Sequence, residues 1–272
     1  NKDKQLFSII KNYELYDYLL SELKKNKFFI VKKNNSYLMN DNNYNLIINS
    51  DINSSITKKF FYKKISKKYN SHGHVSIVEH QKISNNTAVQ VFTKKGPIAF
   101  LPISKNETSI VYSASGKKNI EKIELENLIK KNLHKLKIKK IGNIKSFELK
   151  SINLRTYHYK NILAFGDLLH KIHPLAGQGF NMVIRDIKVL LNLINYKINL
   201  GIELDNSICA EFEKKSKSQN FLFSSGIDFI YEFFNFESKS KIKLISKSIQ
   251  LFGKNKTINK FLIKLADSGN VV

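Results

Sequence analysis

Several residue types are scarce in this chain of 272 residues, which has one cysteine, three prolines and no tryptophan. Because Cys209 has no second cysteine to pair with, an internal disulfide is excluded, and we expect a reducing, cytoplasmic compartment. No uninterrupted apolar run is long enough to cross a bilayer.

Arginine is also scarce, although the formal net charge is +24. All but two of the 46 basic residues are lysines, and the exceptions are Arg155 and Arg185. Proteins that recognise nucleic acid favour arginine, because its planar guanidinium binds phosphates and bases through two parallel hydrogen bonds. The lysines are spread over the whole chain beside many Asn, Ile, Phe and Tyr residues, the amino acids of AT-rich codons. We therefore expect no nucleic-acid partner, while a basic surface remains suited to docking on anionic lipid.

What the chain does contain is typical of a globular protein, with 42% hydrophobic residues, 19 Phe and 12 Tyr. Its most informative segment is 162–186. The apolar run 162–165 predicts a short buried strand that stops at Gly166-Asp167. A loop with Pro174, Gly177 and Gly179 follows, and a long amphipathic helix is expected from about Asn181.

This order of strand, acid, glycine loop and helix is typical of α/β proteins that hold a nucleotide-like cofactor at the carboxyl end of a sheet. The Asp167 carboxylate can accept hydrogen bonds from sugar hydroxyls. Glycines let the backbone approach a ligand closely, and the free N–H groups of a helix start favour negative charge.

The segment resembles the second FAD-binding motif of the flavin-dependent aromatic-ring hydroxylases, and most closely their ubiquinone-biosynthesis branch. Leu168 and Leu169 replace the small pair that is usual there. The residues that match are Gly166, Asp167, His170, His173, Pro174, Ala176, Gly177, Gln178, Gly179, Asn181, Arg185 and Asp186.

Two further segments resemble the same family. In 46–58, Asp51, Ser55 and Lys58 occupy the Asp, Ser and basic positions of a G-A-D-G-A-x-S-x-x-R motif, although Asn49 and Ile52 replace glycines. A solvated loop after a strand is the alternative interpretation. The run G-P-I-A-F-L-P-I from Gly96 resembles a strand that lies over the substrate side of the flavin.

The resemblance implies a mixed α/β fold. A discontinuous, Rossmann-like FAD-binding domain would comprise residues 1–70 and 156–200. A mixed β-sheet substrate domain would be inserted at 71–155, and a helical tail would follow at 201–272.

The residue pattern predicts individual elements as well. Helices are expected at 9–23, 121–136 and 181–199 and from 211 onward, with the stripe Ile184, Ile187, Leu191, Ile194 and Ile198 forming the core face of the third helix. Strands are expected at 28–32, 36–39, 45–48, 75–78, 87–92, 98–103, 109–112, 147–149 and 162–165. In the tail, a basic amphipathic helix around 242–252 suits either a membrane surface or packing on the domain.

The resemblance implies an FAD-dependent monooxygenase, which uses NAD(P)H and O₂ to hydroxylate an aromatic ring. Such chemistry belongs to the cofactor and requires no catalytic side chain. The expected FAD-binding residues are Gly166, Asp167, His173, Pro174, Ala176, Gly177, Gln178, Gly179, Phe180, Asn181 and Asp51. Asp167, His170 and His173 also have a spacing that could hold a metal on a helix, but Pro174 favours an extended turn, so no metal is expected.

The family's opening strand and G-x-G-x-x-G turn have no counterpart in this sequence, and the chain begins with Asn1. We therefore expect an N-terminally incomplete flavoprotein acting on a polyprenylated phenol in ubiquinone synthesis. It would lie on the inner face of the cytoplasmic membrane, in contact with a ubiquinone-synthesis complex. The alternatives are a non-catalytic remnant that serves as a scaffold, or another flavoprotein branch such as a geranylgeranyl reductase; a halogenase is disfavoured because the chain lacks tryptophan.

Overall fold

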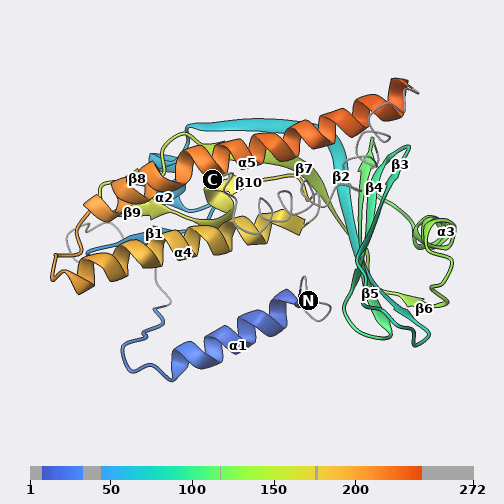
Figure 1. The fold of residues 1–272 in the computed structure, drawn as a ribbon, viewed down its shortest axis with the longest axis horizontal. Helices are drawn as coiled ribbons and strands as arrows, with labels where there is room; N and C mark the ends of the chain where they lie inside the picture. Colours follow the sequence, from blue (N-terminus) through green and yellow to red (C-terminus); the bar gives the residue numbers. More distant parts are fainter. Residues whose placement is uncertain (1–7, 33–43, 117, 175–176, 241–272) are drawn as a thin grey trace, which may run out of the picture.

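The computed structural model describes residues 8–32, 44–116, 118–174 and 177–240. Its elements follow in this order: α1 (Asn12–Lys24), β1 (Ile47–Asn49), α2 (Ser55–Phe60), β2 (Lys64–His80), β3 (Val89–Thr93), β4 (Gly96–Pro102), β5 (Glu107–Ser115), α3 (Lys122–Asn132), β6 (Ile138–Ile141), β7 (Lys145–Leu154), β8 (His158–Tyr159), β9 (Ile162–Ala164), the 3₁₀ turn η3 (Gly166–Leu168), β10 (His170–Lys171), α4 (Gln178–Asn199) and α5 (Ser207–Ser240). A small sheet lies between α4 and α5, and a large antiparallel sheet stands beside it with α3 on its far side (Figure 1).

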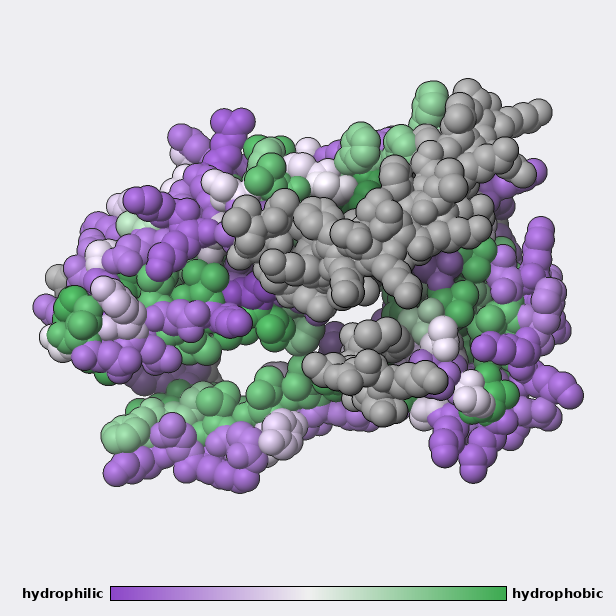
Figure 2. All heavy atoms as spheres, viewed as in Figure 1, coloured by the Kyte–Doolittle hydropathy of each residue, from purple (hydrophilic) through white to green (hydrophobic). Residues whose placement is uncertain are grey.

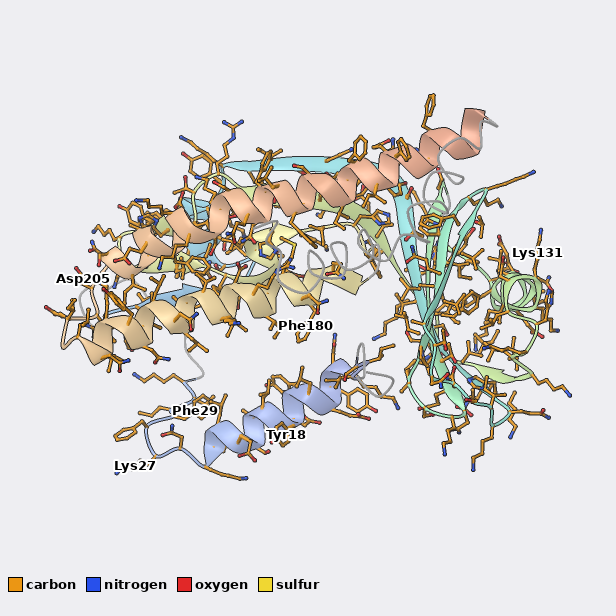
Figure 3. All side chains as sticks on the ribbon, in the orientation of Figure 1. Tyr18, Lys27, Phe29, Lys131, Phe180 and Asp205 are labelled. Atoms are coloured by element: carbon orange, nitrogen blue, oxygen red, sulfur yellow. The ribbon has the colours of Figure 1, made fainter. Side chains whose placement is uncertain are left out.

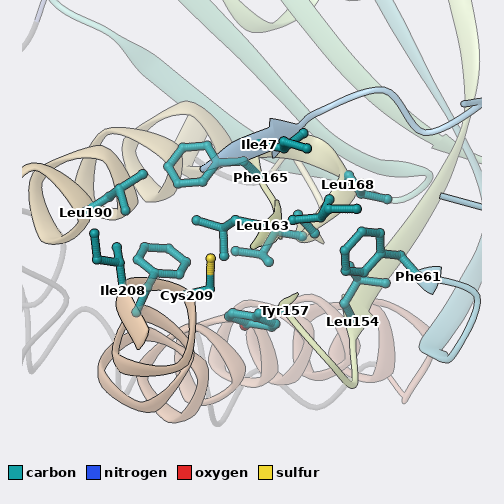
Figure 4. Close-up of a cluster of buried hydrophobic side chains, with 14 of the residues drawn as sticks. Ile47, Phe61, Leu154, Tyr157, Leu163, Phe165, Leu168, Leu190, Ile208 and Cys209 are labelled. Carbon is teal, nitrogen blue, oxygen red and sulfur yellow. The ribbon is translucent and has the colours of Figure 1, made fainter. Parts of the chain in front are cut away.

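The small sheet has the order β1-β9-β8, and β1 runs parallel to β9. The apolar run of β9 is fully buried. Leu163 lies at the centre of a core to which α4 contributes Leu190 and α5 contributes Cys209 and Phe212 (Figure 4). Burial raises the pKa of the Cys209 thiol to about 11, so this cysteine acts as a small apolar side chain.

The large sheet has the order β10-β7-β2-β5-β4-β3, and β6 also pairs with β2. Its core side chains alternate along the strands and include Val78, Phe100 and Ile110, each at most 1% exposed. Helix α3 covers this core with Leu125 and Ile129.

Strand β2 connects the two parts of the fold. It pairs with β7 from Lys64 to Lys68 and again from His72, with a shift of register between them. Asn70 has a positive φ of 50°, and the strand bends in this region (Figure 1). The domain boundary expected between residues 70 and 71 therefore falls at a bend inside one strand, while β7 ends one residue before the boundary expected at 155. The division into domains stays a prediction.

The strand expected at 28–32 is wrong, because these residues form a turn and irregular chain. Phe28 and Ile30 are 80% and 72% exposed, so no strand among the described residues covers these side chains. The strand expected at 36–39 and the helix at 242–252 lie outside the described residues. The first half of β2 and the whole of β6 were not expected, since their lysines hide the alternation of apolar residues.

The core face expected for α4 is also wrong. Ile184, Leu191 and Ile198 are 48%, 51% and 55% exposed, and only Ile194 of that stripe packs against the core. The helix is apolar on two faces, and the face with Met182, Leu190 and Leu193 is the buried one. Apolar residues of α4 and of α1 line the two sides of an open space (Figure 2), and α1 buries no residue of its own. Within the described residues, none of the helices combines the length and apolarity that crossing a membrane requires.

Candidate functional site

The candidate site begins where the parallel strands β1 and β9 end. The N–H of Phe165 donates to the Asn49 carbonyl (2.9 Å), so the two strands leave the sheet together. Gly166 follows with φ +65°, and a Cβ added there would meet the Ser50 Cβ at 4.0 Å. Carboxyl ends of parallel strands are the usual ligand-binding edge of an α/β sheet.

Each strand is followed by an aspartate whose side chain is exposed. Asp167 is in η3 after β9, and Asp51 comes two residues after β1. Asp51 Oδ1 accepts a hydrogen bond from the Asn53 N–H (2.8 Å), which stabilises its own turn. The structure thus brings Asp51 and Asp167 to the same edge, and Asp51 has a local structural role as well.

The loop after η3 leads into the amino end of α4. Gly177 precedes the helix in the left-handed conformation, with φ 65° and ψ 23°, and no side chain caps the first turn. The first N–H groups of a helix have no partner inside the helix and carry its positive partial charge. The start of α4 therefore offers donors to an anionic or polar ligand, as the sequence predicts for Gly177, Gln178 and Gly179.

The remaining residues of the expected set are placed as follows. Phe180 is 54% exposed and lies on the side of α4 that faces α1 (Figure 3). Asn181 is exposed and its amide donates to Gln178 Oε1 (3.4 Å). Pro174 is half-buried, while Ala176 lies outside the described residues.

A buried hydrogen-bond network holds this loop onto α4 and α5. The His170 Nε2–H donates to Asp186 Oδ2 (2.5 Å), and the Asn220 amide donates to Asp186 Oδ1 (2.9 Å). His170, Asp186 and Asn220 are 2%, 2% and 5% exposed. Two buried donors and one carboxylate satisfy one another here, which makes the network a rigid support for the loop.

His173 is fully buried and packs edge to face on Tyr69 and at a tilt on Tyr231. Its ring centroid lies 5.0 Å from that of Tyr69 and 4.3 Å from that of Tyr231. Neither ring nitrogen has a hydrogen-bond partner among the described residues, and burial lowers the pKa of His173 to about 4. This neutral ring holds the loop against β2 and α5, and a direct contact of His173 with the cofactor stays a prediction.

The two tyrosines are tied to neighbouring elements. The Tyr69 hydroxyl donates to Asp228, and Tyr231 shares a hydrogen bond with the Ser71 hydroxyl (2.8 Å). Burial and the carboxylate of Asp228 both raise the pKa of Tyr69, which therefore stays protonated.

Sequence reasoning missed the contribution of α5 to this region. The polar residues Ser216, Asn220 and Ser224 repeat every fourth position, a spacing that places them on one helical face. This spacing is visible in the sequence. In a chain with so many polar residues, however, it does not distinguish a buried polar face of a helix from a solvent-exposed one.

The described residues contain no group of three or more His, Cys, Asp or Glu side chains arranged to hold a metal ion. His170 bonds to Asp186 and His173 packs on Tyr231, so these two histidines have different surroundings.

Comparisons with known proteins agree with this geometry. The model of the FAD binding domain family matches residues 63–199. The 3-demethoxyubiquinol 3-hydroxylase of Escherichia coli is 29% identical over 157 residues, which cover 54% of this chain and 39% of that protein. The ubiquinone biosynthesis monooxygenase COQ6 of Schizosaccharomyces pombe is 20% identical over 274 residues, covering 82% of this chain and 57% of that protein. The chain thus spans 39% to 57% of the length of these relatives.

Solved structures share the fold at low sequence identity. The p-nitrophenol 4-monooxygenase PnpA of Pseudomonas putida superposes with a TM-score of 0.64 at 13% identity, over 83% of this chain and 59% of that one. The anhydrotetracycline hydroxylase OxyS of Streptomyces rimosus gives a TM-score of 0.60 at 10% identity, over 82% and 46%. The mixed α/β fold expected from the sequence is confirmed, as is the resemblance to FAD-dependent aromatic-ring hydroxylases. The chain belongs to the FAD binding domain family.

Proposed function

We propose that this protein is an FAD-dependent monooxygenase that hydroxylates an aromatic ring with NAD(P)H and O₂, and that its substrate is a polyprenylated phenol of ubiquinone synthesis. The observation that carries the proposal is the loop between β9 and α4. It has left-handed glycines at both ends, Gly166 and Gly177, and it leads into a helix start without a side-chain cap.

The residues present fit FAD. A cofactor with a diphosphate, sugar hydroxyls and a polar ring edge requires close backbone approach and N–H donors, which Gly177 and the first turn of α4 supply. The exposed carboxylates of Asp51 and Asp167 suit hydroxyl groups. Asp167 would contact the ribityl or pyrophosphate region, and Gln178 to Asn181 the polar edge of the ring.

FAD, when bound, supplies hydride acceptance from NAD(P)H and transfer of one oxygen atom from O₂ to the ring, with the other atom leaving as water. The protein's own residues bind and orient. Backbone N–H groups at the start of α4 favour negative charge on the cofactor. The network of His170, Asp186 and Asn220 holds those groups in place.

The polyprenylated phenol is proposed from the relatives, whose names place them in ubiquinone hydroxylation and biosynthesis. The large antiparallel sheet would form the substrate side. It bears the Gly96-Pro97 strand β4 and meets the loop region through β10 and β7.

One observation favours a second candidate, a non-catalytic scaffold of the same fold: Asn49 and Ile52 replace two glycines of the motif that segment 46–58 resembles. Flavin binding by the protein at its native length separates the two candidates, because only the enzyme needs the cofactor.

The test uses two glycines with equal strain. Gly177 and Gly201 both have φ +65°, and a Cβ added at either position meets no atom of the described residues within 4 Å. Gly177→Ala and Gly201→Ala should therefore cost similar stability, on the order of 1 kcal/mol. We expect only Gly177→Ala to weaken FAD binding, by about tenfold, in a fluorescence titration, because only Gly177 lies at the proposed site.

Wild-type protein that binds no FAD would reject the enzyme. Equal FAD affinity in the two variants would reject this loop as the site. Substrate turnover is checked separately by mass spectrometry, as the gain of one oxygen atom by a prenylated phenol that depends on NADPH.

A further inference from the structure

Helix α5 buries polar as well as apolar side chains along its length. Between the apolar Phe212 and Ile227, its buried positions are the polar Ser216, Asn220 and Ser224, which are 2%, 5% and 1% exposed. These residues meet polar partners, since the Asn220 amide donates to Asp186 and the Asn153 amide donates to the Ser224 hydroxyl (2.8 Å). Further along the helix, Asp228 accepts hydrogen bonds from the β2 and β7 side chains Tyr69 and Ser151.

The outward face of the same helix carries large apolar side chains among polar ones. Leu222, Phe229 and Phe236 follow one another at seven-residue intervals and are 70%, 67% and 64% exposed. Residues seven apart lie on one side of a helix, so these three form a ridge along it. The Phe229 ring stacks on Phe233 at 5.5 Å, which widens it. Apolar atoms are visible along the upper edge of the molecule, where α5 runs (Figure 2).

At the amino-terminal end of the ridge, the exposed side chains are lysines. Lys215 lies seven residues before Leu222 on the same line and is exposed, and Lys214 is exposed beside it. We call Lys215, Leu222, Phe229 and Phe236 the α5 ridge. Aromatic and aliphatic side chains next to lysines are the composition of helices that lie in a membrane interface.

A pocket of about 420 Å³ opens beside the ridge, between α5, the start of β2 and the end of β7. Arg155 and Lys217 line it together with the apolar side chains of Ile65 and Phe221. Arg155 is one of only two arginines in a chain with 46 basic residues, at a place where its forked guanidinium suits a phosphate. Asn153 also lines the pocket, and its buried Oδ1 has no hydrogen-bond partner among the described residues.

We propose that the α5 ridge docks this protein on an anionic membrane surface, with a lipid headgroup phosphate in the Arg155 pocket. The net charge favours a membrane over a second copy of this chain as the partner of the ridge. With a formal charge of +24, two copies that meet face to face repel each other, whereas an anionic leaflet attracts each copy. The pocket offers the Arg155 guanidinium to the phosphate, beside Lys217, which also binds Glu213 (2.6 Å), and the ridge offers apolar area to the acyl chains.

Flotation with lipid vesicles tests the proposal on the whole protein, and no flavin is needed, so the result is independent of the proposed enzyme. The wild type should float with vesicles of equal parts phosphatidylglycerol and phosphatidylcholine and remain unbound with pure phosphatidylcholine. Leu222→Ser combined with Phe229→Ser should weaken binding at least about tenfold, because two exposed apolar anchors are lost. Lys214→Gln combined with Lys215→Gln should weaken it by about tenfold at low salt.

Matched controls lie on the opposite side of the large sheet. Ile123 of α3 is 70% exposed, and Lys139 and Lys140 of β6 are exposed. Ile123→Ser and the pair Lys139→Gln, Lys140→Gln should bind vesicles like the wild type. Because all the altered side chains are exposed, circular dichroism should show unchanged folding. Undiminished flotation of the Leu222→Ser, Phe229→Ser protein would overturn the proposal. So would a wild type that ignores vesicles but forms a dimer which those substitutions dissociate.

Discussion

The large antiparallel sheet and the cofactor-side region are stabilised in different ways. In the large sheet, apolar side chains close on one another under α3, and Val78, Ile98 and Ile110 are completely buried. On the cofactor side, the core around Leu163 is equally well buried, but it is bordered by exposed apolar residues such as Ile48 of β1 and Leu191 of α4, both 51% exposed. In the described part of the chain, β1 is also an edge strand.

On the cofactor side, buried hydrogen bonds add to the apolar packing. The loop at the candidate site is held by the buried pair of His170 and Asp186. Asn220 holds α5 onto α4, and Ser224 and Asp228 hold it onto β7 and β2, where these strands of the large sheet reach the cofactor side. Hydrogen bonds require specific partners at specific distances, whereas apolar packing tolerates substitution of similar volume. The difference suggests that shape-conserving changes are tolerated in the large sheet and that changes of polar partner are tolerated poorly around the loop.

The largest effect is expected in the apolar core of the large sheet. Phe100 is 1% exposed, and Phe100→Ala removes a ring from the cluster that includes Tyr112 and Ile129. We expect a loss of about 4 kcal/mol in the free energy of unfolding, measured by urea denaturation. Ile123→Ala, on the exposed side of α3, is the control and should change it by less than about 0.5 kcal/mol. Similar losses in both variants would contradict a core centred on Phe100.

A somewhat smaller effect is expected from the buried polar network. Asp186→Ala leaves the donors of His170 and Asn220 buried without an acceptor, and should cost about 3 kcal/mol. Asp186→Asn keeps one acceptor oxygen, so its loss should be clearly smaller in the same denaturation series. If Asp186→Ala is as stable as the wild type, the loop is not supported by this network.

The third effect depends on pH and concerns His173. Its folded pKa of about 4 lies below the ordinary value of 6.5, so between these values the unfolded chain binds a proton that the folded protein does not. The free energy of unfolding is therefore not reduced by this residue above pH 6.5, and it decreases as the pH falls toward 4. At pH 5 the loss relative to pH 8 should be about 2 kcal/mol.

Thermal denaturation of His173→Phe over this pH range checks the assignment. The variant should lose that part of the pH dependence, whereas His134→Gln, at an exposed histidine, should follow the wild type. An unchanged pH profile in His173→Phe would show that another group titrates.

Local patterns in the sequence predicted much of the fold and the position of the site. The strand 162–165, the glycines at 166 and 177 and the helix after them are in place, because each depends on a few neighbouring residues. The first half of β2 was missed, since its lysines and the bend at Asn70 obscure the period of two, and its pairing with β7 involves residues some 80 positions away. The roles of Asn220 and Asp228 were missed because partners far away in sequence determine which polar face is buried.

The α4 stripe shows why periodicity alone could not identify the buried face. Both faces of the helix have apolar residues at helical spacing, and only the contact with β9 and α5 selects the one with Leu193, which is 2% exposed. Periodicity predicts that a helix is amphipathic and leaves the choice between two apolar faces to tertiary packing.

The smallest effect is expected on the exposed face of α4, and it tests directly which face of this helix is buried. Ile184→Ser, at a side chain that is 48% exposed, should change the free energy of unfolding by less than about 0.5 kcal/mol. Leu193→Ser on the buried face should cost about 3 kcal/mol or more, because it leaves a cavity and buries a hydroxyl. Urea denaturation of the two variants side by side measures the difference. If Ile184→Ser were the more damaging substitution, the stripe with Ile184 and Leu191 would be covered in the native protein, and the contrast between the closed sheet and the open cofactor side would disappear.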